Sequence, residues 1–286
     1  MNEPVSASVS GRPQPRVPSF GTAVARVFDL SLGEMLWSRR TLFLIVVLGA
    51  PVLLALVFRI VDIWWRAPLT VNGERVSGVV LFGVLIWWVY LRFVVPVLGV
   101  FYGTALIADE VEDKTITYLF TRPVPRSAVL FGKYLAYLAC TTLVVLPSVL
   151  LVFFLLVPLR EIGTSFTTLL IDLGLLALGL AVYGGIFAFV GTWLKRPLIA
   201  GLVFAFGWEQ IAMLMPGYLR RLTAVYYLQG LVPHAIPSDG IVSLLAYTFS
   251  DTPGAAVCLI SLGSALIVSL VLAARTIGRR EYVLSQ

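Results

Sequence analysis

The chain has 286 residues, of which 59% are hydrophobic and 13% are charged, and its mean hydropathy is +0.95. This composition excludes an ordinary soluble domain, in which about a quarter of the residues are charged. It indicates an integral membrane protein. The formal net charge of +6 would favour a nucleic-acid partner in a soluble protein, but in a membrane protein the positions of the charges have to be compared with the topology first.

The N-terminal residues 1–19 are polar and rich in Pro, Ser and Arg, without the apolar core of a cleavable signal peptide. We expect this tail to be disordered. Beyond it, apolar residues such as Val24 and Val27 recur on one helical face, while Arg26 falls on the other. The pattern predicts an amphipathic helix over residues 20–40 that lies along the inner membrane surface. The alternative is that this stretch is simply the start of the first span.

Six apolar segments follow, each near or above the about 20 residues that a helical span needs and too long for barrel strands. The predicted spans cover residues 41–58, 79–107, 134–158, 167–194, 198–216 and 254–274. The sequence therefore predicts an all-α integral membrane protein with a six-span transmembrane domain over residues 41–274 and a cytoplasmic tail over residues 275–286. The fifth and sixth spans are joined by a long outer connection that opens with a helix-like run, Tyr218–Leu231.

Lys and Arg residues are concentrated in alternate connections, as the positive-inside rule requires. Placing the N-terminus inside assigns most of them to the cytoplasmic side, including the pairs Arg39–Arg40 and Lys195–Arg196. We therefore expect a multi-pass protein of the cell membrane with both termini cytoplasmic. This topology accounts for the basic charge, so we expect the lipid bilayer and no nucleic acid as a partner.

A charged, helix-compatible insert, Glu110–Lys133, separates the second and third predicted spans. Its charges cannot lie in hydrocarbon, so the insert lies at the water interface or docks onto a soluble partner. Acidic residues begin it, where a helix N-terminus favours negative charge. An apolar face with helical spacing follows, formed by Ile116, Leu119 and Phe120, and Pro123 ends the predicted helix. An interfacial helix without a partner would show the same amphipathic pattern.

The order of residues in this insert resembles the permease subunits of ATP-binding-cassette type-2 exporters. Their cytoplasmic segment between the second and third spans typically reads E-x-E-x-G-T, then Leu-Leu, then P-x-x-R, then G-K. The matching residues here are Glu110, Glu112, Thr115, Leu119, Pro123, Arg126, Gly132 and Lys133. Two positions depart, because Lys114 replaces the usual Gly and Phe120 replaces the second Leu. The acidic pair followed by Lys-Thr is similar to a subset of the family that includes permeases linked to copper-enzyme maturation.

The resemblance implies that the insert is a coupling helix seated on a separate ATPase subunit. It also implies a complex of two ATPases and two permeases, for which we expect a homodimer of this chain. The implied coupling-helix residues are Glu110, Glu112, Asp113, Thr115, Ile116, Leu119, Phe120, Pro123 and Arg126. The chain has no G-x-x-x-x-G-K-[ST] motif, so ATP and Mg²⁺ are expected on the partner and no cofactor or catalytic residue on this chain. The implied function is the transmembrane permease subunit of an ATP-driven exporter.

Three ionisable residues fall inside the predicted spans, where charges are rare and often functional. Glu209 and Arg92 lie at similar depth, about 18 and 22 Å from the inner ends of their helices. They could form a buried ion pair that fixes helix register, or they could line a cavity. Asp172 is expected near the outer interface and solvated. On the same span, the small-residue row ending at Gly185 predicts tight helix packing.

A second functional class remains open, an ion- or solute-coupled secondary transporter that works without an ATPase. It would use Arg92 and Glu209 as a charge relay, although the sequence has no clear internal repeat. An intramembrane enzyme is disfavoured because no set of catalytic groups converges. A metal site is not expected, because His234 is the only histidine. The cysteines, Cys140 and Cys258, fall in predicted spans and are interpreted as packing residues.

Overall fold

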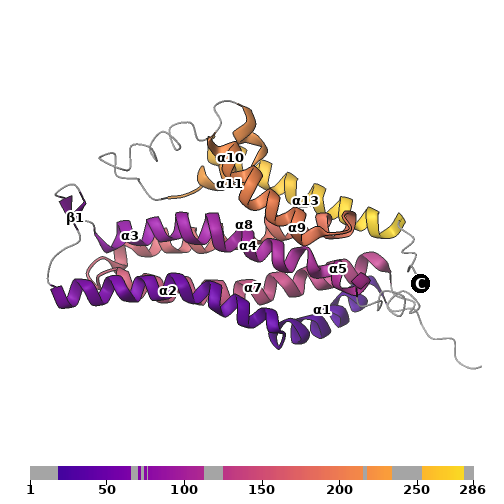
Figure 1. The fold of residues 1–286 in the computed structure, drawn as a ribbon, viewed down its shortest axis with the longest axis horizontal. Coiled ribbons are helices and arrows are strands. Elements are labelled where there is room, and N and C mark those ends of the chain that lie inside the picture. Colours follow the sequence, from indigo (N-terminus) through magenta and orange to yellow (C-terminus); the bar gives the residue numbers. More distant parts are fainter. Residues whose placement is uncertain are drawn as a thin grey trace, which may run out of the picture.

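The computed structural model describes residues 19–65, 70–71, 74–75, 77–112, 125–214, 218–233 and 253–279. Long helices run roughly side by side along the molecule, and shorter helices lie against one side of them (Figure 1). The elements of the N-terminal half are α1 (Phe20–Leu36), α2 (Arg39–Trp65), β1 (Thr70–Val71), β2 (Glu74–Arg75), α3 (Gly78–Val84), η1 (Leu85–Val94), α4 (Val95–Leu98), η2 (Gly99–Gly103) and α5 (Ala105–Glu112). Strands β1 and β2 pair antiparallel in a small hairpin.

The C-terminal half is also helical wherever the structure describes it. Its elements are α7 (Arg126–Leu156), α8 (Ile162–Trp193), α9 (Pro197–Leu202), η3 (Val203–Trp208), α10 (Glu209–Leu214), η4 (Tyr218–Leu222), α11 (Ala224–Gln229) and α13 (Ala255–Arg279). The helix-like run expected in the outer connection is thus divided into two short helices, η4 and α11. Thr223 separates them and caps α11 by accepting a hydrogen bond from the backbone N–H of Tyr226.

Five helices in the described residues are long and apolar enough to cross a membrane. They cover Thr41–Trp64, Gly78–Ala108, Arg126–Leu156, Ile162–Trp193 and Ala255–Arg279. The fold is therefore that of a multi-pass, helical membrane protein, as the composition predicts, with the two-residue strands of the β1–β2 hairpin as its one β element in the described residues. The fifth predicted span, residues 198–216, corresponds to a shorter apolar helix, Pro197–Ala212. At about 1.5 Å per residue this helix rises less than the about 30 Å of a hydrocarbon core.

The second long helix, Gly78–Ala108, contains two π-helical segments, η1 and η2. Pro96 lies just after η1, and a proline has no N–H to donate to the carbonyl four residues earlier, which is that of Arg92. This gives a local reason for the departure from α-helical geometry around Arg92. A third π-helical segment, η3, lies alongside, because the rings of Phe93 and Phe206 are 5.8 Å apart. Such segments often occur at functional positions.

Three long helices form the centre of the molecule, namely Gly78–Ala108, α7 and α8, while α2 packs against α7 and α13 against α8. Glycines bring these backbones together. A Cβ added at Gly99 would lie 2.7 Å from Tyr183 Cβ of α8. Gly185 does the same toward α13, where an added Cβ would lie 2.9 Å from Ser269 Oγ. The tight packing expected for Gly185 is therefore present, since small residues allow close approach where lipid offers no hydrophobic driving force between helices.

Helix α1 packs against the first half of α7. The ring centroids of Phe20 and Phe131 are 6.4 Å apart, in an edge-to-face arrangement. Gly132 lies beneath Val27, and an added Cβ there would be 2.7 Å from Val27 Cβ and 2.9 Å from the carbonyl oxygen of Val24. A helix therefore exists over most of the predicted residues 20–40, with Arg26 exposed as expected. Its place along the inner membrane surface stays a prediction.

The contact at Gly132 leads to a stability prediction. Replacing Gly132 by Ala places a methyl group against a β-branched side chain and a backbone carbonyl, so we expect the free energy of unfolding to fall by about 1–2 kcal/mol. Thermal unfolding of the purified chain in a mild detergent measures this.

The matched control is Gly174→Ala in α8, where an added Cβ has no neighbour within 4 Å. Both substitutions gain the same helix propensity, about 1 kcal/mol, so the difference between them isolates the contact with α1. Equal unfolding temperatures for the two variants would show that α1 does not pack closely enough against Gly132 to exclude a methyl group.

Candidate functional site

The two ends of the predicted coupling segment lie at one end of the molecule. Glu110 and Glu112 lie in the last turn of α5, which continues the second long helix, and Arg126 is the first residue of α7. The two acidic residues therefore end a helix, and the prediction that they begin one is wrong. The remaining predicted coupling residues lie outside the described residues: Asp113, Thr115, Ile116, Leu119, Phe120 and Pro123. The structure therefore describes how the segment is attached to the second and third long helices.

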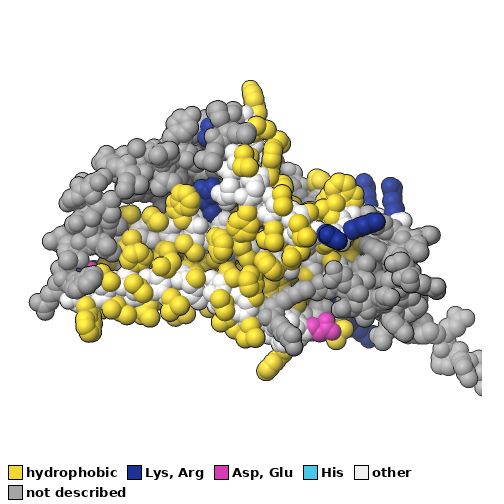
Figure 2. Space-filling model, viewed as in Figure 1, with side chains coloured by type: hydrophobic (Ala, Val, Ile, Leu, Met, Phe, Trp, Pro, Cys, Tyr) yellow, Lys and Arg dark blue, Asp and Glu magenta, His cyan; other side chains and the backbone are white. Residues whose placement is uncertain are grey.

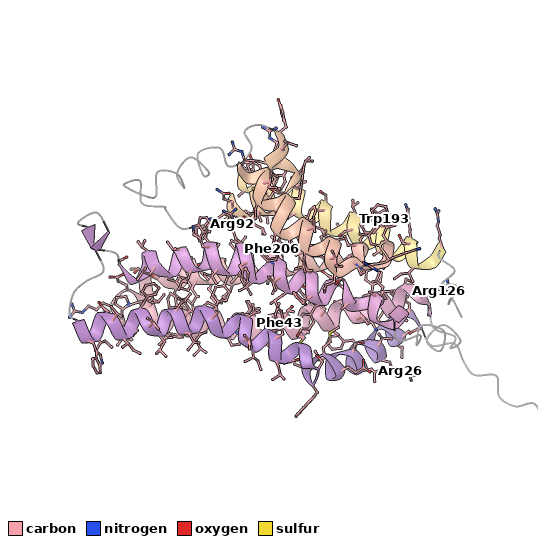
Figure 3. The ribbon with its side chains drawn as sticks, in the orientation of Figure 1. Arg26, Phe43, Arg92, Arg126, Trp193 and Phe206 are labelled. Atoms are coloured by element: carbon pink, nitrogen blue, oxygen red, sulfur yellow. The ribbon has the colours of Figure 1, made fainter. Side chains whose placement is uncertain are left out.

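Exposed basic side chains gather at this same end. Figure 2 shows Lys and Arg side chains concentrated there, while hydrophobic side chains cover most of the long helices. Figure 3 labels Arg26 on α1 and Arg126 on α7 at this end. The exposed basic residues of α1, α7, the α8–α9 connection and α13 are Arg26, Arg126, Lys195, Arg196, Arg275 and Arg279.

A cluster of polar groups lies farther along the helices, where η1, α8, α10 and α11 meet. We call Arg92, Tyr183, Glu209 and Gln210 the intramembrane polar cluster. Glu209 is 1% exposed. Its carboxylate accepts a short hydrogen bond from the Tyr183 hydroxyl and a second one, at 3.3 Å, from the backbone N–H of Ala224. Both oxygens of this buried acid are thus occupied by donors from two other helices, as a buried carboxylate requires.

Arg92 has different partners. Its Nη2 atom donates to Gln210 Oε1 at 2.6 Å, and its guanidinium lies 4.7 Å from the ring centroid of Trp88. Figure 3 labels Arg92 on the side of the second long helix that faces the short upper helices. Arg92 and Glu209 remain close enough to attract each other, but the guanidinium contacts Gln210. The reason is angular: Glu209 and Gln210 are consecutive on α10, so their side chains point about 100° apart.

Asp172 does not have the solvated position expected from its depth. Its side chain is completely buried, on the same face of α8 as the buried residues Leu169 and Leu176. Position along a helix decides how far a residue lies from the membrane surface. The helical face on which it lies decides whether it contacts other helices or lipid and water. The position of Asp172 along the predicted span gives only the first of these quantities.

Buried tyrosines connect the central helices. The Tyr137 hydroxyl donates to the carbonyl oxygen of Leu180 at 2.9 Å, and that of Tyr134 donates to the carbonyl of Ala181 at 2.8 Å. Tyr90 on η1 and Ser148 on α7 share a hydrogen bond of 3.0 Å. Sequence reasoning identified none of these residues, nor Tyr183 or Gln210. Their one signal was a polar atom within an apolar span, which must find a partner inside the protein.

Potential metal ligands are not clustered in the residues that the structure describes. No group of three or more His, Cys, Asp or Glu side chains there could hold a metal ion. Cys140 and Cys258 are buried and unpaired by a disulfide. The arrangement consists instead of long apolar helices, a polar cluster between them and a charged connection at one end.

These features define a multi-pass membrane protein whose embedded charges are held by other helices. The model of one family, described as ABC-2 family transporter protein, matches residues 54–281, which is most of the chain. The chain belongs to this family, and the resemblance inferred from the 110–133 insert is confirmed. It is therefore a membrane component of a transporter, without catalytic activity of its own. A search of curated proteins found no match.

The contacts of Glu209 predict a stability effect for Tyr183. Replacing Tyr183 by Phe removes one donor from a buried carboxylate, so we expect the free energy of unfolding to fall by about 1–3 kcal/mol. The measurement is unfolding of the purified chain in detergent.

Tyr218→Phe provides the control, since Tyr218 is 80% exposed and its ring can still contact Arg221 without the hydroxyl. We expect no measurable change in that variant. If Tyr183→Phe were as stable as Tyr218→Phe, the hydrogen bond to Glu209 would have no structural importance.

Proposed function

We propose that this chain is the transmembrane permease subunit of an ATP-driven exporter and that a separate ABC ATPase subunit powers it. The observation that carries this proposal is the family match, which extends over residues 54–281 and so includes the whole charged insert. The insert has the order of residues expected of a coupling helix. ATP and Mg²⁺ would bind to the partner, and this chain would convert motion of the ATPase into rearrangement of its helices.

The attachment of the insert supports this coupling. Helix α5 continues the second long helix, and α7 begins the third, so a displacement of the segment between them would act on both. The first half of α7 also contacts α1 through Gly132. A displacement of the insert by the ATPase would therefore act on the second long helix, α7 and α1 together.

Within the insert, we assign two kinds of contact. The acidic residues Glu110, Glu112 and Asp113 would form charge-assisted hydrogen bonds with the ATPase, which are about twice as strong as neutral ones. The apolar residues Ile116, Leu119 and Phe120 would fill a groove on the partner, as buried anchors do at protein interfaces. Thr115, Pro123 and Arg126 would fix the start and end of the docked segment.

We further propose six membrane crossings in the cell membrane, with both termini cytoplasmic. Support comes from the basic side chains at the end of the molecule that carries the insert, because positive charge favours the cytoplasmic side. The start of α1 and the end of α13 lie toward this end (Figure 1). An even number of crossings is required for that arrangement, and Pro197–Ala212 is the available sixth segment. A second copy of the chain would complete the transport path.

The coupling assignment predicts a loss of partner binding on charge reversal. In a variant with Glu110→Lys and Glu112→Lys, we expect recovery of the ATPase with the tagged permease to fall at least about tenfold, because two charge-assisted contacts become repulsive. Purification from the native membrane in a mild detergent, with mass identification of a Walker-motif ATPase, measures this. The amount of permease in the membrane should not change.

A control variant with Asp29→Lys and Glu34→Lys carries the same charge change on exposed positions of α1 and should retain the ATPase. Equal recovery from both variants would reject the coupling assignment. If the unmodified chain instead purifies alone and transports in liposomes under an ion gradient, it is a secondary transporter.

A further inference from the structure

Arg92 and Glu209 have unequal surroundings, although they lie at similar depth. Glu209 is buried between α8, α10 and α11, and both of its carboxylate oxygens accept hydrogen bonds. Arg92 is half-buried and lies over Trp88, which is 41% exposed. The next residue, Phe93, is 46% exposed, and its ring contacts that of Phe206, which is 39% exposed. We call this surface, formed by Trp88, Arg92, Phe93 and Phe206, the Arg92 face. A ligand can reach the cation but not the acid.

The hydrogen-bonding capacity of Arg92 is mostly unused. A guanidinium carries five N–H donors, and within the described part of the chain its one hydrogen bond goes to the neutral Gln210. The Nε atom is buried without a hydrogen-bond partner there. A charged side chain within an apolar span normally pairs with an opposite charge or with backbone carbonyls, and a single side-chain amide oxygen is a weaker partner than either. The forked geometry of arginine suits the oxygen pair of a carboxylate or phosphate.

The depth of Arg92 restricts the source of such an anion. The residue lies near the middle of the Gly78–Ala108 helix, about 20 Å from either end at about 1.5 Å per residue. The hydrocarbon core is about 30 Å thick, so the headgroups of surrounding phospholipids lie well away from Arg92. An acidic group at this depth belongs to a molecule that is crossing the membrane or is held within it.

The aromatic side chains describe the rest of the ligand. Trp88 precedes Arg92 by one helical turn, and Phe93 contacts Phe206 of the neighbouring π-helical segment. These exposed rings offer apolar area next to a cation. A molecule that fits both has an acidic head and an apolar body.

We propose that the Arg92 face binds an amphipathic anion, with its carboxylate or phosphate head on Arg92 and its apolar part against Trp88, Phe93 and Phe206. This anion is the cargo, so the inference rests on the proposed transport function and names its substrate class. Glu209 has a separate role: it positions α10, and with it Gln210, which orients the guanidinium.

The test uses the full-length chain in dodecyl maltoside, without ATPase or nucleotide, and dodecyl phosphate as the probe. Native mass spectrometry counts the dodecyl phosphate molecules bound to the chain during a titration. The surrounding dodecyl maltoside has the same alkyl chain and no charge, so it competes for the apolar contacts alone. We expect one saturable site in the unmodified chain. Arg92→Gln should weaken it at least about tenfold, and Arg92→Lys less, because lysine keeps the charge but not the fork.

The matched control is Arg221→Gln. Arg221 is an exposed arginine that also lies over an aromatic ring, 5.0 Å from the Tyr218 centroid, and its loss should leave the affinity unchanged. Unchanged affinity in Arg92→Gln would overturn the inference. If that variant does not fold, Trp88→Ala provides the second test, since it should weaken binding by removing apolar contact without changing charge, and unchanged affinity there has the same meaning.

Competition distinguishes cargo from bulk lipid. Phosphatidylglycerol at the same mole fraction should leave most of the probe bound, whereas full displacement would make the site an ordinary lipid site and reject the cargo role. The ATPase experiment is independent of these results. Recovery of the ATPase together with unaltered probe binding in Arg92→Gln would reject this inference alone, and failure to recover an ATPase would reject the proposed function.

Discussion

The close backbone approach between the second long helix and α8 is the constraint on which the other contacts depend. Gly99 lies against Tyr183, and Gly103 against Phe187, where an added Cβ would be 2.9 Å from Phe187 Cβ. This approach places the Tyr183 hydroxyl beside Glu209, and Glu209 in turn holds the first backbone N–H of α11. A larger residue at Gly99 would therefore move the polar cluster as well as the helices. Between helices in lipid, such packing and internal hydrogen bonds replace the hydrophobic effect as the stabilising interactions.

The same packing gives Glu209 and Arg92 different hydrogen-bond partners, although both lie within the membrane-spanning part of the protein. Glu209 and Gln210 are neighbours in sequence, yet one faces α8 and α11 and the other faces Arg92. The acid is thereby satisfied inside the protein, while the half-buried cation has, among the described residues, one neutral hydrogen-bond acceptor and the ring of Trp88 as partners. An isolated pair would have neutralised both charges and left nothing for a ligand. This division of partners is the structural basis of the anion site that we propose.

The charged insert and the polar cluster lie at different levels of one helix. The Gly78–Ala108 helix carries Arg92 near its middle and leads directly into α5, where the predicted coupling segment begins. Arg92 lies within the π-helical segment η1, and the second π-helical segment, η2, lies between it and α5. π-Helical geometry differs from the α-helix in hydrogen-bond register, and such segments often occur at functional positions. Under the proposed coupling, a displacement of the insert would reach Arg92 along this one helix.

The sequence by itself determined the membrane class, the positions of five long helices and, through the residues of the 110–133 insert, the family. These properties depend on local quantities, namely the length and composition of apolar runs and the spacing of a short motif. The tertiary structure decided what the sequence could not: the burial of Asp172, the partner of Arg92, and the contact of Gly132 with α1. Each of these depends on the rotation of a helix about its axis and on residues far away in the chain, such as Gln210 for Arg92 and Val27 for Gly132. Hydropathy locates each apolar segment along the chain, but only the packing of the helices fixes the direction in which each side chain points.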